Sequence, residues 1–144
     1  VAESIRTRVL VECEIARLAA PRVEPERADR LQQALCAEQA HHVPHADYVS
    51  NRLMVHHLLA EMAGNRLLQA VATALFRLTG EVILLVKPPR KVIHRTEEHA
   101  AIVRAVLSRS PDAAVDAMRR HLERMAKRLT PLEGAYRRPM GADG

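Results

Sequence analysis

Aromatic residues are almost absent from this chain. Its 144 residues include two Tyr, one Phe and no Trp. The core must therefore be built from aliphatic side chains and Met, and few rings are available to stack on nucleic-acid bases. Glycine is also scarce, with five residues, and this scarcity combined with many Ala and Leu favours helices.

Cysteine and long apolar runs are scarce too. The two cysteines, Cys13 and Cys36, fall inside helical patterns, so they do not indicate a disulfide framework. No uninterrupted apolar run is long enough to span a bilayer, and no signal peptide is visible. We therefore expect a cytoplasmic protein without a membrane partner.

Positive charge is in excess, but it is not concentrated. The 22 Lys and Arg outnumber the 17 Asp and Glu, which gives a net charge of +5. This excess permits contact with nucleic acid. The basic residues are scattered along helices among acidic ones, however, so most of them are interpreted as a solvated surface.

Helical periodicity runs through nearly every segment. We expect an all-α fold, an antiparallel bundle of about six helices, in one domain over residues 1–130, followed by a flexible tail over 131–144. The run EVILLVK (81–87) has strand-like residues, but no partner strand exists, so we predict helix there, kinked or weakened near Gly80. The predicted helices cover residues 2–20, 25–41, 47–63, 66–87, 97–107 and 111–125.

Two histidines are placed symmetrically about the turn between the last two predicted helices. Ser110 is a good N-cap there, and Pro111 suits the first helical position. His99 lies 11 residues before Ser110 and His121 lies 11 residues after it. At about 1.5 Å of rise per residue, each is roughly 16 Å from the turn, so both imidazoles lie at one level. Two inward histidines at one level can form half of a metal site.

Simpler interpretations apply to each histidine alone. A single histidine on an apolar helix face is more often a core residue with a hydrogen-bond partner. Glu38 and His41 form one E-x-x-H, but a di-iron bundle needs that motif twice, so this interpretation is rejected. The chain has no Gly-rich phosphate loop and no Ser–His–Asp or Cys–His signature.

The order of helical motifs resembles one known family. The stretch RVLVECEIARLAA (8–20), then VHHLLAEMAGNRLL (55–68), then EEHAAIVRAV and AVDAMRRHL, is similar to the C-terminal effector-binding FCD domain of the FadR subfamily of GntR-type bacterial transcription regulators. The match spans about residues 3–125. Val11 and Val55 stand where the family has Leu and Phe.

The resemblance implies a ligand pocket inside the bundle, often with a divalent metal such as zinc or nickel. In metal-binding members three histidines and one Asp coordinate the ion, and the matching histidines here are His56, His99 and His121. The Asp position, four residues before His56, holds Arg52. A cation is unfavourable beside a divalent ion unless it is turned away or paired with an anion.

Two interpretations of Arg52 stay open. In one, three histidines still hold the metal, water or effector completes the shell, and Arg52 turns aside or binds an anionic effector. In the other, no metal binds, and Arg52 itself supplies positive charge to a carboxylate ligand. Arg8 and Arg77 are weaker candidates for contact with the effector. A pocket with neutral, hydrogen-bonded histidines and no metal is the structural alternative.

The resemblance therefore predicts a sensor that binds a small organic acid and acts through a homodimer. The family's N-terminal winged helix-turn-helix has no counterpart in this chain, so operator DNA would be bound only through a missing N-terminal domain. A helical metal-dependent enzyme is a less favoured alternative, because no Glu or Asp falls predictably beside the three histidines. A dimerisation module without ligand is a third possibility. The sequence does not name the effector.

Overall fold

The computed structural model describes residues 2–39, 44–93 and 95–137, and all regular structure in these ranges is helical. Six main helices are joined by short connections, one of which is the single-turn helix α5. The elements are α1 (Ala2–Ala19), the 3-10 turn η1 (Ala20–Arg22), α2 (Pro25–Glu38), α3 (His45–Met62), α4 (Arg66–Val86), α5 (Arg90–Ile93), α6 (Thr96–Leu107) and α7 (Pro111–Arg137).

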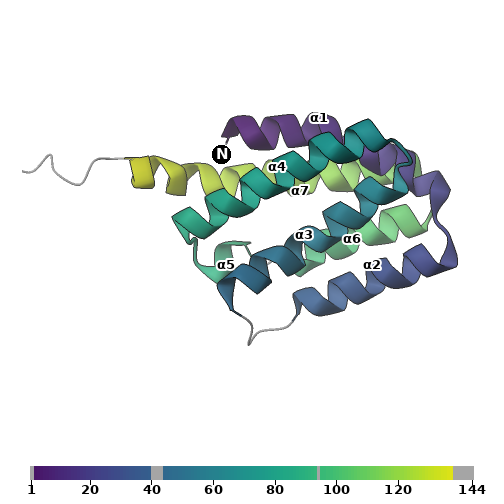
Figure 1. The fold of residues 1–144 in the computed structure, drawn as a ribbon, viewed down its shortest axis with the longest axis horizontal. Helices are drawn as coiled ribbons and strands as arrows, with labels where there is room; N and C mark the ends of the chain where they lie inside the picture. Colours follow the sequence, from purple (N-terminus) through teal and green to yellow (C-terminus); the bar gives the residue numbers. More distant parts are fainter. Residues whose placement is uncertain (1, 40–43, 94, 138–144) are drawn as a thin grey trace, which may run out of the picture.

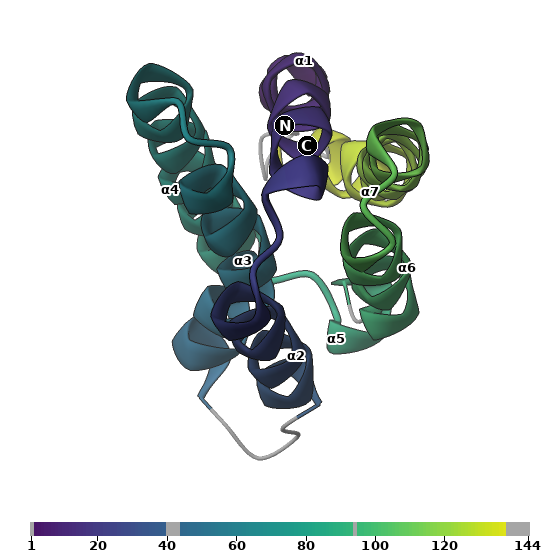
Figure 2. The ribbon, with the colours of Figure 1, turned by 90° about the vertical axis from the view of Figure 1, so that its right-hand side faces the viewer.

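The six main helices close into a ring. Each contacts the next in the order α1, α7, α6, α2, α3, α4 and back to α1, and α3 also packs against α1 across the ring. Figure 1 shows the long α4 and α7 running past the shorter α1, and Figure 2 shows the arrangement from one end. Side chains that point inward from helices far apart in sequence therefore meet.

Helix α3 is the most enclosed element near the centre of the bundle. Its inner positions include Val55, Leu59 and His56, which are between 0% and 2% exposed. It packs against α1, α2 and α4, so apolar residues occupy nearly every side of it, as the sequence predicts. Two polar side chains of this helix, Arg52 and His56, are buried and therefore need partners.

Local sequence signals explain where the helices begin and end. The Asn65 side chain accepts hydrogen bonds from the backbone N–H groups of Leu67 and Leu68, which caps the start of α4. Gly64, just before it, has φ +71°, a conformation that favours glycine. The predicted Ser110 cap is present, because its Oγ accepts from the Ala113 N–H at 3.3 Å.

Helix α4 confirms the helical assignment of EVILLVK. It continues from Arg66 to Val86 as one helix that includes Gly80. At the other end of the chain the prediction of a flexible tail over 131–144 is wrong for residues 131–137, because they continue α7 with Pro131 inside the helix. Pro131 offers no N–H to the helical hydrogen bonds, but α7 continues through it. Residues 138–144 lie outside the described residues, as do His41 and His42.

Candidate metal centre and effector cavity

Three histidines from three helices meet in the middle of the ring. His56 comes from α3, His99 from α6 and His121 from α7, and their exposed fractions are 2%, 2% and 3%. The Nε2 atom of His99 lies 3.2 Å from Nε2 of His56 and 3.2 Å from Nε2 of His121. One nitrogen of each ring lies within 4.8 Å of the other two. The convergence expected from the turn spacing and the family resemblance is therefore present.

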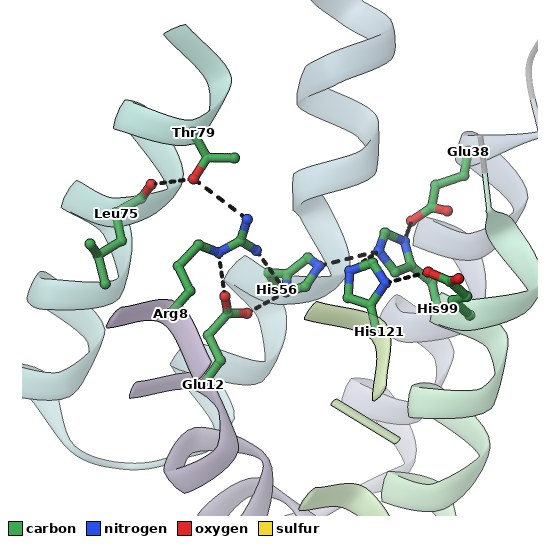
Figure 3. Close-up of polar contacts among 9 residues, drawn as sticks. Arg8, Glu12, Glu38, His56, Leu75, Thr79, His99 and His121 are labelled. Atoms are coloured by element: carbon green, nitrogen blue, oxygen red, sulfur yellow. Dashed lines mark hydrogen bonds and ion pairs between the residues drawn. The ribbon is translucent and has the colours of Figure 1, made fainter. Parts of the chain in front are cut away.

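Each of these rings contacts a glutamate through Nδ1, the nitrogen that does not face the other histidines (Figure 3). His99 Nδ1 lies 2.5 Å from Glu38 Oε1, and His121 Nδ1 lies 2.8 Å from Glu98 Oε2. His56 Nδ1 makes the matching contact with Glu12 Oε2. In each pair the two residues come from different helices, so the three contacts connect α1 to α3, α2 to α6, and α6 to α7.

These contacts decide which ring nitrogens face the centre as bases. A carboxylate accepts hydrogen bonds only, so an Nδ1–H that donates to it leaves the Nε2 lone pair of the same ring directed inward. Two lone pairs facing each other at 3.2 Å require a proton or a cation between them. Three nitrogens bound to one zinc at about 2.0–2.1 Å in tetrahedral directions lie roughly 3.3–3.4 Å apart. The donor set and its spacing therefore fit a divalent metal.

A second polar network supports the His56 side of the centre. Arg8, 1% exposed on α1, donates from Nε to Glu12 Oε1 at 2.5 Å, and its Nη1 reaches Thr79 Oγ1 on α4 at 3.5 Å. Thr79 in turn donates to the Leu75 carbonyl at 2.9 Å. Arg8 thus orients Glu12, and Glu12 orients His56.

The histidines form part of the wall of a cavity with an empty volume of about 480 Å³, counted with the part open to solvent. Three arginines, Arg8, Arg52 and Arg128, also line it, with an apolar remainder formed by Val49, Leu53, Ile83, Val92, Ile93, Met125 and Leu129. The cavity therefore offers cationic groups and imidazoles in an apolar surround.

Residues 3–124 match the FCD domain family. This chain belongs to the FCD domain family. The family resemblance seen in the order of the helical motifs is confirmed by this match. The all-α fold inferred from the sequence is confirmed by this match and by the structure.

Two relatives illustrate the similarity. The chain is 29% identical over 118 residues to the HTH-type transcriptional repressor NanR of Cronobacter sakazakii (strain ATCC BAA-894), covering 80% of this chain and 45% of that protein. Among solved structures, Streptococcus agalactiae GntR superposes with a TM-score of 0.74 at 23% identity, covering 88% of this chain and 57% of that one. This chain spans about half the length of these regulators, and the structural likeness establishes the fold.

The arginines predicted from sequence are not all at the cavity of this FCD domain. Arg52 and Arg8 line it, whereas Arg77 lies on the outer surface of α4, 82% exposed in its side chain and paired with Glu81 at 3.2 Å. Arg77 is therefore removed from the set of effector-binding candidates. Arg128, which the sequence analysis did not single out, takes its place.

Arg52 lies next to the His99 side of the centre. Its Nη1 is 3.6 Å from Glu38 Oε2, an ion pair that is too long for a hydrogen bond, and within the described residues neither atom has another hydrogen-bond partner. Its guanidinium carbon is 6.0 Å from the centre of the Tyr48 ring. The side chain is thus directed at Glu38 and Tyr48, and no ligand to a metal comes from this position.

The carboxylates behind the histidines have strongly shifted acidities. Burial by itself raises the pKa of Glu12, but the charges of Arg8 and His56 outweigh it and lower the pKa to about 2. Burial also opposes ionisation of Glu98, yet hydrogen bonds from His121 and Arg128 bring its pKa to about 2. For Glu38 burial dominates and raises the pKa to about 8, only partly offset by Arg52.

The three imidazoles are all kept neutral by burial. Burial lowers the pKa of His56 and of His99, for His99 well below 6.5, and it lowers the pKa of His121 to about 4 despite the bond to Glu98. Neutral imidazole is the form that binds a metal. The centre is therefore in the ligand form at neutral pH.

The net charge of the side chains around the cavity indicates the class of ligand. Three arginines and three glutamates surround the cavity, and each glutamate contacts the Nδ1 atom of one histidine. Glu12 and Glu98 are ionised at neutral pH, but the pKa of Glu38 is raised to about 8, so the charge of Arg52 is only partly compensated. A divalent cation added to this arrangement leaves a buried excess of positive charge, which an anion relieves. The site thus suits an anionic ligand next to the metal position.

The sequence places no Glu or Asp predictably beside the histidines, but the structure has three there. Glu12, Glu38 and Glu98 each contact one ring. Glu98 is adjacent to His99 in the sequence, but it contacts His121. Glu38 comes from α2, where it stands at the end of the apolar helix face and nothing in the sequence links it to His99. The sequence could have predicted only the contact between Arg8 and Glu12, because these residues are four apart on one helical face.

Proposed function

We propose that this FCD domain senses a small carboxylate through a divalent metal, zinc or nickel, held by His56, His99 and His121. The observation that carries the proposal is the convergence of three Nε2 atoms whose rings are each anchored at Nδ1 by a buried glutamate. Anchoring by carboxylates of this kind fixes the ring tautomer and strengthens metal ligands. When bound, the metal would supply an open, positively charged coordination position for the carboxylate.

The wider role proposed for the domain follows from the family. GntR-family membership supports a transcription regulator in which effector binding here is transmitted to operator DNA through a separate DNA-binding domain, with a homodimer in the cytoplasm as the acting form. The relative from Cronobacter sakazakii is named as an HTH-type repressor, which is consistent with this arrangement.

The metal content of matched histidine variants tests the centre. We expect the chain, incubated with zinc or nickel and then desalted, to retain one metal ion, and His121→Ala to lose it. His57→Ala should retain the metal, because His57 points roughly 100° away from His56 on α3 and its ring packs edge-on against Phe76 at 4.9 Å between centroids. A wild-type chain that binds neither metal would contradict the proposed centre.

A second function is favoured by one observation, the position of Arg52. Its Nη1 has no acceptor within hydrogen-bond distance in the described part of the chain, although the side chain lines the cavity. A ligand carboxylate could pair with this guanidinium without any metal. In this alternative the effector pocket is centred on Arg52.

Calorimetry with small carboxylates separates the two functions. Binding that disappears when the metal is chelated supports the metal-centred sensor, whereas binding that survives chelation supports the pocket centred on Arg52. In either case Arg52→Ala should weaken binding roughly tenfold if Arg52 contacts the carboxylate, since a desolvated charge-assisted pair is lost. Arg77→Ala is the matched control, because Arg77 is exposed and outside the cavity. Unchanged affinity in Arg52→Ala would remove Arg52 from the site.

A further inference from the structure

The connection between α4 and α6 is strongly basic. Residues 87–96 contain four Lys and Arg and no Asp or Glu. This segment carries the one-turn helix α5, which packs against α7. Over most of the chain, in contrast, basic residues are scattered among acidic ones.

Part of this segment forms a groove beside the effector cavity. Lys91, Val92, Arg95 and Arg128 line it, and its empty volume is about 690 Å³, counted with its open side. Val92 and Arg128 also line the inner cavity, so the two hollows share a wall. A ligand anchored in the cavity next to His121 has this groove as its neighbouring space.

The cations of the groove differ in how their charge is compensated. Arg128 donates to both oxygens of Glu98, at 2.8 and 2.9 Å, so its charge is already matched. Lys91 is exposed and Arg95 is half-buried, and neither forms an ion pair with any described residue. Two uncompensated cations in a concave surface favour an anion.

We propose that this groove is a second anion subsite, and that the effector is an organic acid with a further anionic group, a phosphate or a second carboxylate, bound by Lys91 and Arg95. The inference rests on the proposed function, because it takes one carboxylate of the ligand to be bound in the inner cavity. The shared residues Val92 and Arg128 place the two subsites next to each other. The groove thus selects for dianionic over monoanionic acids.

Matched ligand pairs test this selection. Calorimetry on the zinc-loaded chain at low ionic strength would compare glycerate with 3-phosphoglycerate, and gluconate with 6-phosphogluconate. We expect the phosphorylated member of at least one pair to bind roughly tenfold more tightly, about 1.4 kcal/mol, because it gains two partly exposed ion pairs. Equal affinities within both pairs overturn the inference.

Two double variants show where the added anion binds. Lys91→Ala with Arg95→Ala should abolish the gain from phosphate and leave the affinity for glycerate or gluconate and the zinc content unchanged. Arg124→Ala with Lys127→Ala removes two exposed cations of α7 that do not line the groove, and it should keep the gain.

The outcomes distinguish this inference from the function on which it rests. A gain that persists in the Lys91 and Arg95 double variant means that phosphate binds elsewhere, such as at the metal, and overturns the second subsite alone. If none of the four acids binds the zinc-loaded wild-type chain, the carboxylate-sensing function fails as well.

Discussion

Each cavity histidine depends on a carboxylate from another helix, so the properties of the centre are set by pairs of residues. Glu98 shows this most clearly, because it contacts His121 and Arg128 at once. A substitution of one such glutamate therefore changes the orientation and basicity of the histidine that it contacts.

Replacing Glu98 by glutamine should weaken zinc binding by roughly 10- to 100-fold, the typical effect of removing a hydrogen-bonding partner of a metal ligand. The change retains size but removes the charge that orients His121 and supports its basicity. Competition against a fluorescent zinc chelator would measure the affinity. Glu81→Gln, in an exposed pair with Arg77, is the control and should leave the affinity unchanged.

The stability of the metal-free chain should fall as pH is lowered from about 6.5 towards 4. The pKa of His121 is lowered to about 4 in the folded state, and those of His56 and His99 are lowered too, so the unfolded chain takes up these protons first. Glu38 acts in the opposite direction, because its raised pKa of about 8 lets the folded state hold a proton. Three imidazoles outweigh one carboxyl group.

Urea denaturation of chelator-treated protein at pH 7, 5.5 and 4.5 would measure this dependence. The midpoint should decrease at each step, and the decrease should be smaller in His121→Gln, which lacks one of the titrating groups. A midpoint that rises as the pH is lowered would contradict the neutral state assigned to the three rings.

At the scale of single helices, glycine has two distinct roles around α3 and α4. Gly80 is buried inside α4, and a Cβ added there would meet Leu53 Cδ1 at 3.5 Å and Val49 Cγ1 at 3.8 Å, which are ordinary contacts. Gly64 connects the two helices with φ +71°, where an L side chain is strained.

Gly80→Ala should therefore stabilise the domain by about 0.5–1 kcal/mol, because alanine loses less backbone freedom in a helix. Gly64→Ala should destabilise it by about 1 kcal/mol or more, since it forces a side chain into the left-handed region. Thermal or urea unfolding of both variants would show whether each one raises or lowers the free energy of unfolding. Destabilisation by Gly80→Ala would mean that α3 and α4 cannot accept even a methyl group.

For the whole molecule, the outer face of α4 is the unusual feature. Arg66–Val86 is long and apolar enough to cross a membrane by length and composition, and 28% of its most apolar 18-residue window is buried. The sequence shows no uninterrupted apolar run of that length, because polar residues interrupt it. Helix α4 packs on α3 and α1, and four of its exposed apolar residues form one stripe: Leu67, Val71, Leu78 and Leu85, which are 41–75% exposed. Leu84, 38% exposed, lies beside this stripe.

We predict that this stripe supports the proposed homodimer. A stripe of this kind is costly to leave in water and suits a second copy of the same helix. Sedimentation should give a dimer at micromolar concentration for the wild type and a monomer for Leu78→Glu. Leu10→Glu is the control, because Leu10 is 76% exposed on α1 and does not belong to the stripe. A wild-type monomer would contradict the prediction.

Sequence by itself determined the helices and the family. Helical periodicity, few aromatics and the cap at Ser110 are local features, and local features decide where helices begin and end. Counting residues also showed that His99 and His121 lie at the same distance from the turn at Ser110, because a helix has a fixed rise per residue. The position of His56 came from the family motif.

Tertiary structure alone decided the partners of those histidines. Glu38 lies 61 residues from His99 along the chain, and Glu12 lies 44 residues from His56, so no local pattern links them. Arg8 and Arg77 are both weak effector candidates in the sequence, yet Arg77 is solvated and Arg8 is buried in the cavity wall. Such contacts depend on how the ring of helices closes, which is a property of packing between distant segments and not of helix formation.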